Sequence, residues 1–329
     1  MKRMYALGLG ITVRRVRLEK YAKDLMQTVS EDNTNSCLES RSTRSLLSPL
    51  AGVYSMITSA RNSAYDNWWF SSTKSSLPVI CVGNVTVGGS GKTPFTAYLT
   101  RELYAMGRRP VVLTRGYRGK FKGPHLVSPS DSPVNVGDEA LLHARSLESY
   151  DVPVVIARDR VLGASYIEYN QLGDVIVLDD GYQHRRLERD VNVLLLDVST
   201  ERSINRWMNG QLLPAGYLRE PFDEALARAN CVVFVNRLGA SNNDVSHLTP
   251  FLKIPSDIPI IQFSLSPSHV VDVASGTRLA LSTLEDKRAC ALTAIGNPDH
   301  FFTTLRGLGV KLCEQQAYRD HHAFSQREW

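Results

Sequence analysis

Short apolar runs alternate with helix-length amphipathic segments from Pro78 onward. The runs are apolar at nearly every position, as in strands buried on both faces, and cover residues 78–84, 109–115, 152–158, 174–181, 190–198 and 230–237. The segments between them that we predict as helices are residues 92–107, 137–147, 159–173 and 222–229. This alternation predicts an α/β fold: a parallel sheet covered by helices, with its active site at the carboxyl ends of the strands.

A polar stretch at residues 238–250 interrupts this rhythm. After it, strand-like and helix-like segments begin again at residues 258–266, 289–296, 298–309 and 310–318. We therefore predict a second, smaller α/β domain over residues 241–329, after a main domain over residues 71–240.

The chain begins with a basic segment. Residues 1–18 contain Lys and Arg but no acidic residue, which is typical of a mitochondrial transit peptide, although a basic tail is the alternative. A serine-rich stretch follows, so we predict that residues 1–42 are an unstructured leader.

Residues 43–70 form the next segment. Apolar residues recur there at helical spacing, with arginines beside them and Trp68, Trp69 and Phe70 after them. This pattern predicts an amphipathic helix lying on a membrane surface. The alternative is a helix packed on the protein's own core.

Composition narrows the function only slightly. The 329 residues are 43% hydrophobic and carry a net charge of +5, too mild for wholesale nucleic-acid binding. The five cysteines form no C-x-x-C pair, and Cys81, Cys231 and Cys290 lie in apolar runs, so we expect reduced structural thiols. No apolar run is long enough to span a membrane.

The stretch "VGNVTVGGSGKTP", residues 82–94, connects a predicted strand to a predicted helix. A phosphate loop needs this context, although Thr86 takes the place of the usual first glycine. Backbone N–H groups would hold phosphates, with Lys92 reaching the β- and γ-phosphates and Thr93 binding Mg²⁺. A tight glycine turn with a solvated lysine is the alternative. The residues predicted to bind the nucleotide are Gly88, Gly89, Ser90, Gly91, Lys92 and Thr93.

Two acidic motifs follow predicted strands or precede predicted helices. Asp179 and Asp180 end an apolar strand, where a Walker-B aspartate holds Mg²⁺; the alternative is that they cap a turn. Asp138 and Glu139, in "VGDEA", precede a helix, and the pattern alone favours helix capping.

Arginines gather at the same predicted edge of the sheet. Each one alone is consistent with solvated surface, but together they favour an anionic second substrate. They are Arg115, Arg158, Arg160, Arg185 and Arg186.

The motifs, in their order, resemble those of the tetraacyldisaccharide 4'-kinases. They include "VGNVTVGGSGKTP", "LTRGYRG", "VGDEALLHAR", "VIVLDDGYQHRRLERD", "NGQLLPAGYLREP" and "AIGNPDHFF", and the likeness covers residues 43–329. The resemblance implies ATP- and Mg²⁺-dependent phosphorylation of the 4'-hydroxyl of an acylated glucosamine disaccharide 1-phosphate, and attachment to a membrane surface. It also implies that the position of Thr86 is normally not glycine.

Site roles follow from the same resemblance. It implies that Asp138 is the catalytic aspartate, with His321 of "YRDHHAF" as its partner, and that Glu139, Asp179 and Asp180 serve Mg²⁺. A carboxylate with a histidine partner suits a hydroxyl that must lose a proton. A plain surface histidine is the alternative for His321.

The sequence departs from the family pattern at both ends. The long N-terminal extension favours an organellar, mitochondrial member over one on the cytoplasmic face of a bacterial inner membrane. The chain stops soon after His321, so we expect an incomplete second domain. The alternative function is an inactive or regulatory membrane-associated P-loop NTPase; a GTP switch is disfavoured because residues 236–239 read N-R-L-G rather than N-K-x-D.

Overall fold

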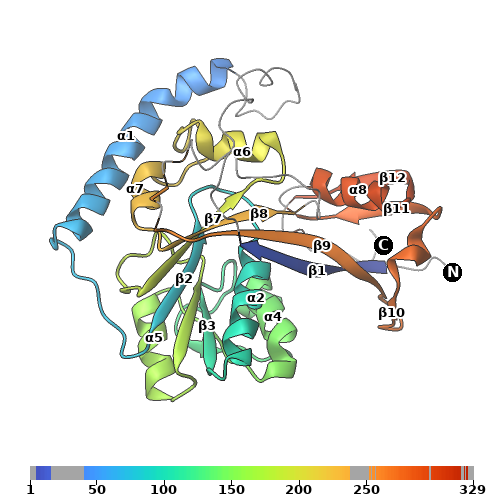
Figure 1. The fold of residues 1–329 in the computed structure, drawn as a ribbon, viewed down its shortest axis with the longest axis horizontal. Helices are drawn as coiled ribbons and strands as arrows, with labels where there is room; N and C mark the ends of the chain where they lie inside the picture. The colour runs from blue at the N-terminus through green and yellow to red at the C-terminus, as the bar shows by residue number, and fades with distance from the viewer. Residues whose placement is uncertain are drawn as a thin grey trace. The chain divides into compact units, whose positions relative to one another are not determined.

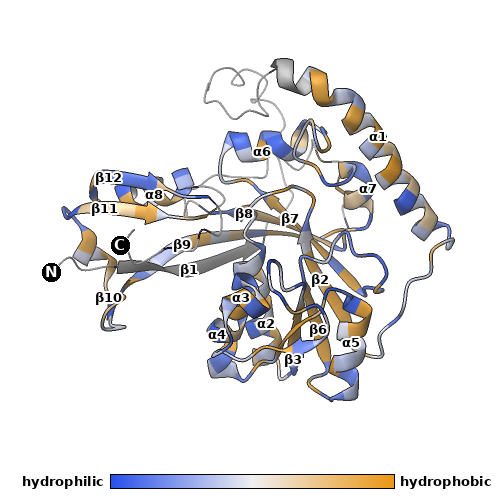
Figure 2. Cartoon of the chain, turned by 180° about the vertical axis from the view of Figure 1, so that it is seen from behind, coloured by the Kyte–Doolittle hydropathy of each residue, from blue (hydrophilic) through white to orange (hydrophobic). Residues whose placement is uncertain are grey.

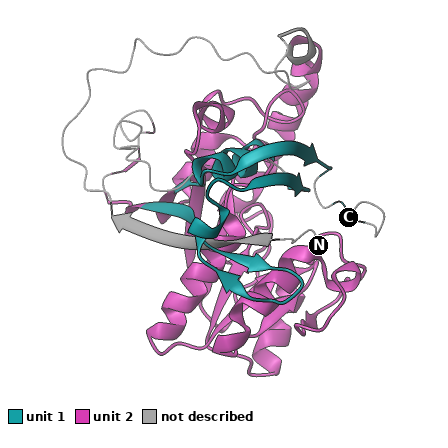
Figure 3. Cartoon of the chain, turned by 90° about the vertical axis from the view of Figure 1, so that its right-hand side faces the viewer, with its two compact units in different colours: residues 1–14, 235–244, 262–329 teal, residues 15–234, 245–261 magenta. Residues whose placement is uncertain are grey.

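The computed structural model describes residues 5–15, 41–237, 252, 254–255, 257–295, 298–319, 322 and 324. The chain divides into two compact units (Figure 3). Unit 1 comprises residues 1–14, 235–244 and 262–329, and unit 2 comprises residues 15–234 and 245–261.

A mainly parallel sheet forms the centre of unit 2, with the strand order β8-β7-β2-β6-β3-β5-β4 (Figure 1). β2 pairs in parallel with β6 and β7, β3 pairs in parallel with β5 and β6, and β4 runs antiparallel to β5. The carboxyl ends of the parallel strands therefore meet at one edge of the sheet. The strands are β2 (Val79–Asn84), β3 (Pro110–Thr114), β4 (His125–Leu126), β5 (Val154–Ile156), β6 (Val175–Asp179), β7 (Val191–Asp197) and β8 (Cys231–Asn236).

Helices cover both faces of this sheet. Successive side chains of a strand point to opposite faces, so Val111 and Leu113 join one buried cluster and Val112 joins another. The cluster with Val111 includes side chains of α5 (Arg160–Tyr169), α6 (Glu201–Met208) and α7 (Phe222–Ala227). The cluster with Val112 includes side chains of α2 (Lys92–Ala105), α3 (Pro133–Val136) and α4 (Asp138–Leu147).

Helix α1 (Arg41–Asp66) precedes the sheet and has two contrasting faces. One face contacts the rest of unit 2: Thr58, Asn62 and Ala64 are buried, and the Tyr54 hydroxyl donates to the Arg219 carbonyl at 2.9 Å. Large apolar side chains on the other face are exposed. They are Leu46, Leu50, Val53, Met56 and Ile57. The hydropathy colouring shows apolar residues recurring along α1 (Figure 2). Within the described part of the chain, no helix has the length and apolarity required to cross a membrane.

Unit 1 contains a small parallel β-α-β motif. β11 (Arg288–Thr293) and β12 (Lys311–Ala317) pair in parallel, and α8 (Pro298–Gly307) connects them in the chain. Phe302 and Leu305 of α8 pack in a cluster with Ala291 of β11. β9 (Ile260–Asp272) pairs antiparallel with β10 (Arg278–Leu279).

The structure confirms the predicted α/β fold class, with each predicted strand and helix of unit 2 present. Two features differ from the sequence analysis. Residues 5–15 form strand β1 (Tyr5–Arg15) inside the predicted leader, because large apolar residues alternate there with small ones, a period-two pattern that the basic charge obscured. Cys290 is exposed, whereas Cys81 and Cys231 are buried as expected, because β11 belongs to a sheet of only two strands.

Candidate active site

The predicted phosphate loop lies between the end of β2 at Asn84 and the start of α2 at Lys92. Gly91 caps the helix with a left-handed backbone (φ 76°), and Gly88 has φ 100°. Residues other than glycine rarely adopt these angles, so both glycines are required by backbone conformation. The loop therefore delivers Lys92 and Thr93 as the first residues of α2.

Thr86 is extended rather than turned, which explains why no glycine stands there. It forms an antiparallel bridge with Leu218, and the flanking bonds join Val87 N to Tyr217 O (2.9 Å) and Arg219 N to Val85 O (2.7 Å). A β-branched residue suits this backbone. The segment "YLRE", residues 217–220, thus acts as a strand-like support for the first half of the loop.

The ammonium group of Lys92 lies among three oxygen atoms. It donates to Asn84 Oδ1 at 3.1 Å and to Ser90 Oγ at 3.5 Å, and it lies 3.6 Å from Asp180 Oδ1. Its side chain is only 12% exposed. These contacts fix the positive charge at the mouth of the loop, where phosphates would bind.

The two aspartates at the end of β6 have different surroundings. Asp179 is buried: its Oδ1 accepts from Thr96 Oγ1 at 3.0 Å, and its Oδ2 lies 2.9 Å from His143 Nε2. Thr96 is on α2 and His143 is on α4, so this carboxylate connects both helices to the sheet.

Asp180 turns toward Lys92 instead. Its backbone is left-handed (φ 50°), an uncommon conformation for a residue other than glycine, and its carboxylate pairs with Arg219 at 3.1 Å as well as with Lys92. Burial alone would raise the pKa of Asp180, but the charges of Lys92 and Arg219 outweigh burial, and the pKa lies below its ordinary value. Asp180 is therefore a carboxylate at neutral pH.

Several oxygen groups near the loop fit Mg²⁺. Among the described residues, no group of three or more His, Cys, Asp or Glu side chains is arranged to hold a metal ion. Mg²⁺ does not require such a cage, because it usually binds one or two carboxylates, water and substrate phosphates. The ionised Asp180 beside the phosphate loop suits that mode of binding, and Thr93 begins the adjacent helix.

The G-D-E motif lies at the start of α4, and a second motif supports it. Gly137 has φ 90°, and a Cβ atom there would collide with the carbonyl oxygen of Tyr117. Just after the "TRGYRG" loop (residues 114–119), Phe121 N donates to the carbonyl oxygen of Asn135, in the segment before Gly137, at 3.0 Å. Asp138 and Glu139 consequently occupy the first turn of α4.

The arginines predicted to face an anionic substrate have mixed roles. Arg185 pairs with Asp66 of α1 at 2.6 Å, and Arg186 pairs with Asp159 at 2.9 Å. Arg160 is buried and donates to the Arg158 carbonyl at 2.8 Å; burial, and then the charge of Arg115, lower its pKa to about 10. Arg115 is exposed and remains a candidate for binding an anion.

Four polar side chains of this site were not predicted from the sequence. Asn84, His143, Gln183 and Arg219 contact the predicted residues Lys92, Asp179 or Asp180, or one another. All four lie inside the quoted motifs, but only their contacts reveal their roles. His321, the predicted partner of Asp138, lies outside the described residues.

The sequence of the chain is similar to those of known kinases. The model of the family described as tetraacyldisaccharide-1-P 4'-kinase matches residues 43–329. A tetraacyldisaccharide 4'-kinase of Syntrophus aciditrophicus is 41% identical over 80% of this chain and 72% of its own length. A protein of the same name from Chromobacterium violaceum is 39% identical over 85% of this chain and 77% of its own.

A solved structure is also similar. It is the crystal structure of the apo form of LpxK from Aquifex aeolicus in complex with ATP, with a TM-score of 0.68 and 33% identity. The likeness covers 86% of this chain and 84% of that one. With its strand, phosphate loop, G-D-E helix and paired aspartates in this order, the chain belongs to the tetraacyldisaccharide-1-P 4'-kinase family.

Proposed function

We propose that this kinase transfers the γ-phosphate of ATP to the 4'-hydroxyl of a tetraacylated glucosamine disaccharide 1-phosphate. Membership of the family supports the kinase activity and the lipid A precursor as substrate. The observation that carries the proposal is the position of Lys92, held beside the phosphate loop by Asn84 and Asp180 at the carboxyl edge of the sheet. A fixed cation there stabilises charge on a transferring phosphoryl group.

Two groups of residues divide the chemistry. Gly88, Gly89, Ser90, Gly91, Lys92 and Thr93 bind the ATP phosphates through backbone N–H groups and the lysine. Asp180, with Asp179, Thr93 and Glu139, would hold Mg²⁺, which neutralises phosphate charge when bound. Asp138 accepts the proton of the attacking sugar hydroxyl, with His321 as its partner. The roles of Asp138 and His321 rest on the family resemblance.

The exposed face of α1 supports attachment to a membrane surface. The exposed fractions of Leu46, Met56 and Ile57 are 80%, 68% and 60%, and those of Trp68 and Trp69 are both 82%. A surface helix normally buries its apolar face, but α1 makes polar contacts with the rest of unit 2 and leaves apolar side chains exposed. Bilayer interfaces accept such a face, with tryptophan at the level of the headgroups.

Attachment can be tested by replacing exposed apolar residues of α1. Leu50→Asp and Ile57→Asp together should move the protein from liposomes of anionic phospholipid to the soluble fraction in a sedimentation assay. Ser48→Asp with Ser63→Asp, which puts the same two charges on exposed polar positions of the helix, is the control. Equal sedimentation of the apolar-face variant and the wild type would contradict the attachment.

A mitochondrial address remains a prediction from the basic residues 1–18. Residues 1–42 fused to a fluorescent reporter should direct it to mitochondria. A diffuse cytosolic signal would contradict this, and would leave the proposed activity untouched.

The activity is tested with γ-labelled ATP and tetraacyldisaccharide 1-phosphate in mixed micelles. Wild-type protein should transfer label to the lipid, and the transfer should depend on Mg²⁺. Label released only as inorganic phosphate would favour the alternative function, a regulatory NTPase. Neither transfer nor hydrolysis would favour an inactive binding protein.

A further inference from the structure

Polar contacts connect α1 to the phosphate loop through a ring of side chains. Lys92 donates to Asn84 Oδ1, and the Asn84 carbonyl accepts from Gln183 Nε2 at 2.9 Å. Arg219 donates to Gln183 Oε1 at 3.4 Å and to Asp180, whose carboxylate faces Lys92. The ring is therefore closed, and displacement of Gln183 would disturb the contacts of the lysine with Asn84 and Asp180.

Glu220 holds Gln183, one member of this ring, in place. It is fully buried, and its Oε1 accepts from Gln183 Nε2 at 3.1 Å. Its Oε2 accepts from Arg228 at 2.7 Å and from Asn62 Nδ2 at 3.1 Å. A buried carboxylate is stable only when its oxygens are paired and hydrogen-bonded, so each of these donors fixes its position.

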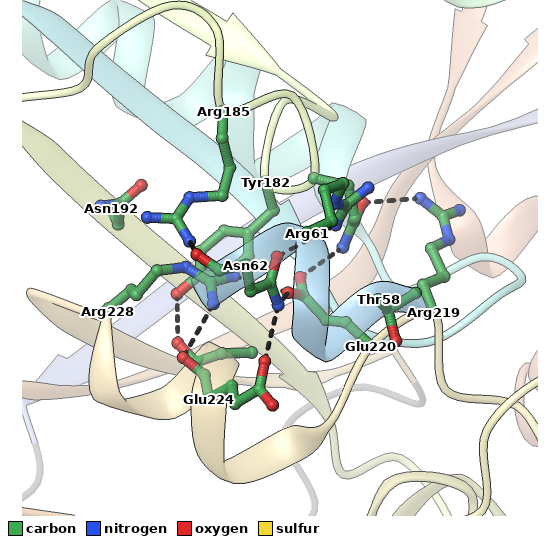
Figure 4. A network of polar contacts seen from close by, with 12 residues as sticks. Thr58, Arg61, Asn62, Tyr182, Arg185, Asn192, Arg219, Glu220, Glu224 and Arg228 are labelled. Carbon is green, nitrogen blue, oxygen red and sulfur yellow. Dashed lines mark hydrogen bonds and ion pairs between the residues drawn. The ribbon is translucent and has the colours of Figure 1, made fainter. Parts of the chain in front are cut away.

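Asn62 is on α1, and its amide group lies between two carboxylates. Nδ2 donates to Glu220 and to Glu224 Oε2, the latter at 2.7 Å, while Arg61 donates to its Oδ1 at 3.2 Å. Figure 4 shows Asn62 pointing from the α1 ribbon toward Glu220 and Glu224. Asn62 is 1% exposed, so water cannot replace these bonds.

A second contact reaches the same support. Tyr54 of α1 donates to the carbonyl of Arg219, whose own N–H donates to Val85 at the start of the phosphate loop. Two side chains of α1 thus converge on Arg219 and Glu220, the pair of residues that touches both the loop and the ring.

We infer that Asn62 and Tyr54 of α1 are positioning residues for the phosphate loop, acting through Glu220 and Arg219. The inference rests on the proposed function only in assigning ATP to this loop. Helix α1 then has two roles: its polar residues help to orient Lys92, and its apolar face stays exposed and available to a membrane surface. Removing the helix contacts should weaken ATP binding even without a membrane.

The inference is tested by Asn62→Leu, which keeps the approximate shape of the side chain and removes its donor. Affinity for a fluorescent ATP analogue should fall about five- to tenfold, the factor that one lost hydrogen bond of ordinary strength corresponds to. The KM for the lipid and the liposome-bound fraction should not change. Ser63→Ala, on the exposed side of α1, should leave all three quantities at their wild-type values.

Tyr54→Phe provides a milder test in case Asn62→Leu does not fold. It removes one hydroxyl group, and the affinity for the ATP analogue should fall about threefold, the effect of a weak hydrogen bond. Tyr65→Phe makes the same deletion on the same helix, at a ring that contacts Phe70 and Arg185, and should have no effect.

The double variant Asn62→Leu with Gln183→Leu tests whether Asn62 acts on the phosphate loop through Glu220 and Gln183. Residues that act as one unit are non-additive, so the double variant should bind ATP no more weakly than the weaker-binding single variant. Wild-type ATP affinity in folded Tyr54→Phe and Asn62→Leu, or fully additive losses, would overturn the inference. Because affinity is measured by binding, failure of lipid phosphorylation in the wild type would contradict the proposed function alone.

Discussion

Helices α2 and α4 begin with the same kind of N-cap but carry side chains of opposite charge in their first turns. Each has a glycine N-cap with a positive φ, 76° at Gly91 and 90° at Gly137, and no capping side chain. Helices α5 and α6, in contrast, are capped by Asp159 and Thr200. The first turn of α2 presents Lys92, whereas that of α4 presents Asp138 and Glu139.

This difference indicates a division of labour at one edge of the sheet. The positive end of α2 adds to the charge of Lys92, which suits phosphate binding. The positive end of α4 instead carries carboxylates, groups that can accept a proton or bind Mg²⁺. Asp179, bonded to Thr96 of α2 and to His143 of α4, connects the two regions.

The largest effect is expected at the start of α2. Lys92→Ala should lower phosphate transfer by about 10²–10³-fold, the usual loss when a positioned group that stabilises transition-state charge is removed. Affinity for ATP should also fall. Single-turnover transfer and equilibrium binding of a fluorescent ATP analogue measure the two effects. Lys74→Ala, at an exposed lysine, is the control; comparable activity in both variants would remove the loop from the mechanism.

A substitution at the start of α4 should lower phosphate transfer without lowering the affinity for ATP. Asp138→Ala should reduce transfer by about 10²–10⁴-fold, the range for loss of a general base, with ATP affinity unchanged. Asp223→Ala removes an acidic residue from the first turn of α7 and should have little effect. A large fall in ATP affinity for Asp138→Ala would erase the distinction between the two helices and return Asp138 to helix capping.

Replacement of Asp180 should change the Mg²⁺ requirement of the reaction more than the affinity for ATP. Asp180→Asn removes the charge that faces Lys92 and Arg219, and should raise the Mg²⁺ concentration needed for half-maximal rate by about 10–100-fold, as changes around metal ligands usually do. A Mg²⁺ titration of the initial rate measures this change. An unaltered Mg²⁺ requirement would show that Asp180 serves only the ion pair.

The smallest effect concerns the connection between the two helices. His143→Leu leaves the buried Asp179 without its partner on α4 and should lower the free energy of unfolding by about 2 kcal/mol. His143→Gln retains an N–H group at a similar position and should lower it by less. Urea unfolding of both variants tests this order; equal losses would mean that the hydrogen bond to Asp179 contributes nothing.

Strong periodic patterns made the fold of unit 2 predictable. Strands such as β3 and β6 are buried at every position and apolar up to their last residue because helices cover both faces, and this signal is local in the sequence. Strand β1 was missed because its alternation lies inside a basic segment.

The candidate site was only partly predictable. Lys92 and Asp180 belong to motifs with fixed spacing, so their proximity follows from the order of the parallel strands. The contacts that Glu220 makes with Asn62 and with Gln183 join residues more than 30 positions apart, and amide and carboxylate groups occur at many surface positions. Only the packing of α1 against unit 2 reveals that these side chains are buried together.

The position of the transferred phosphate shows whether this site is that of a 4'-kinase. The lipid product formed by wild-type protein from ATP and tetraacyldisaccharide 1-phosphate can be analysed by phosphorus–proton correlation NMR. We expect a new phosphate monoester coupled to the proton at the 4' carbon, beside the original 1-phosphate. A product without this coupling, or ATP consumed with the lipid unchanged, would contradict the assignment of this site as a 4'-kinase.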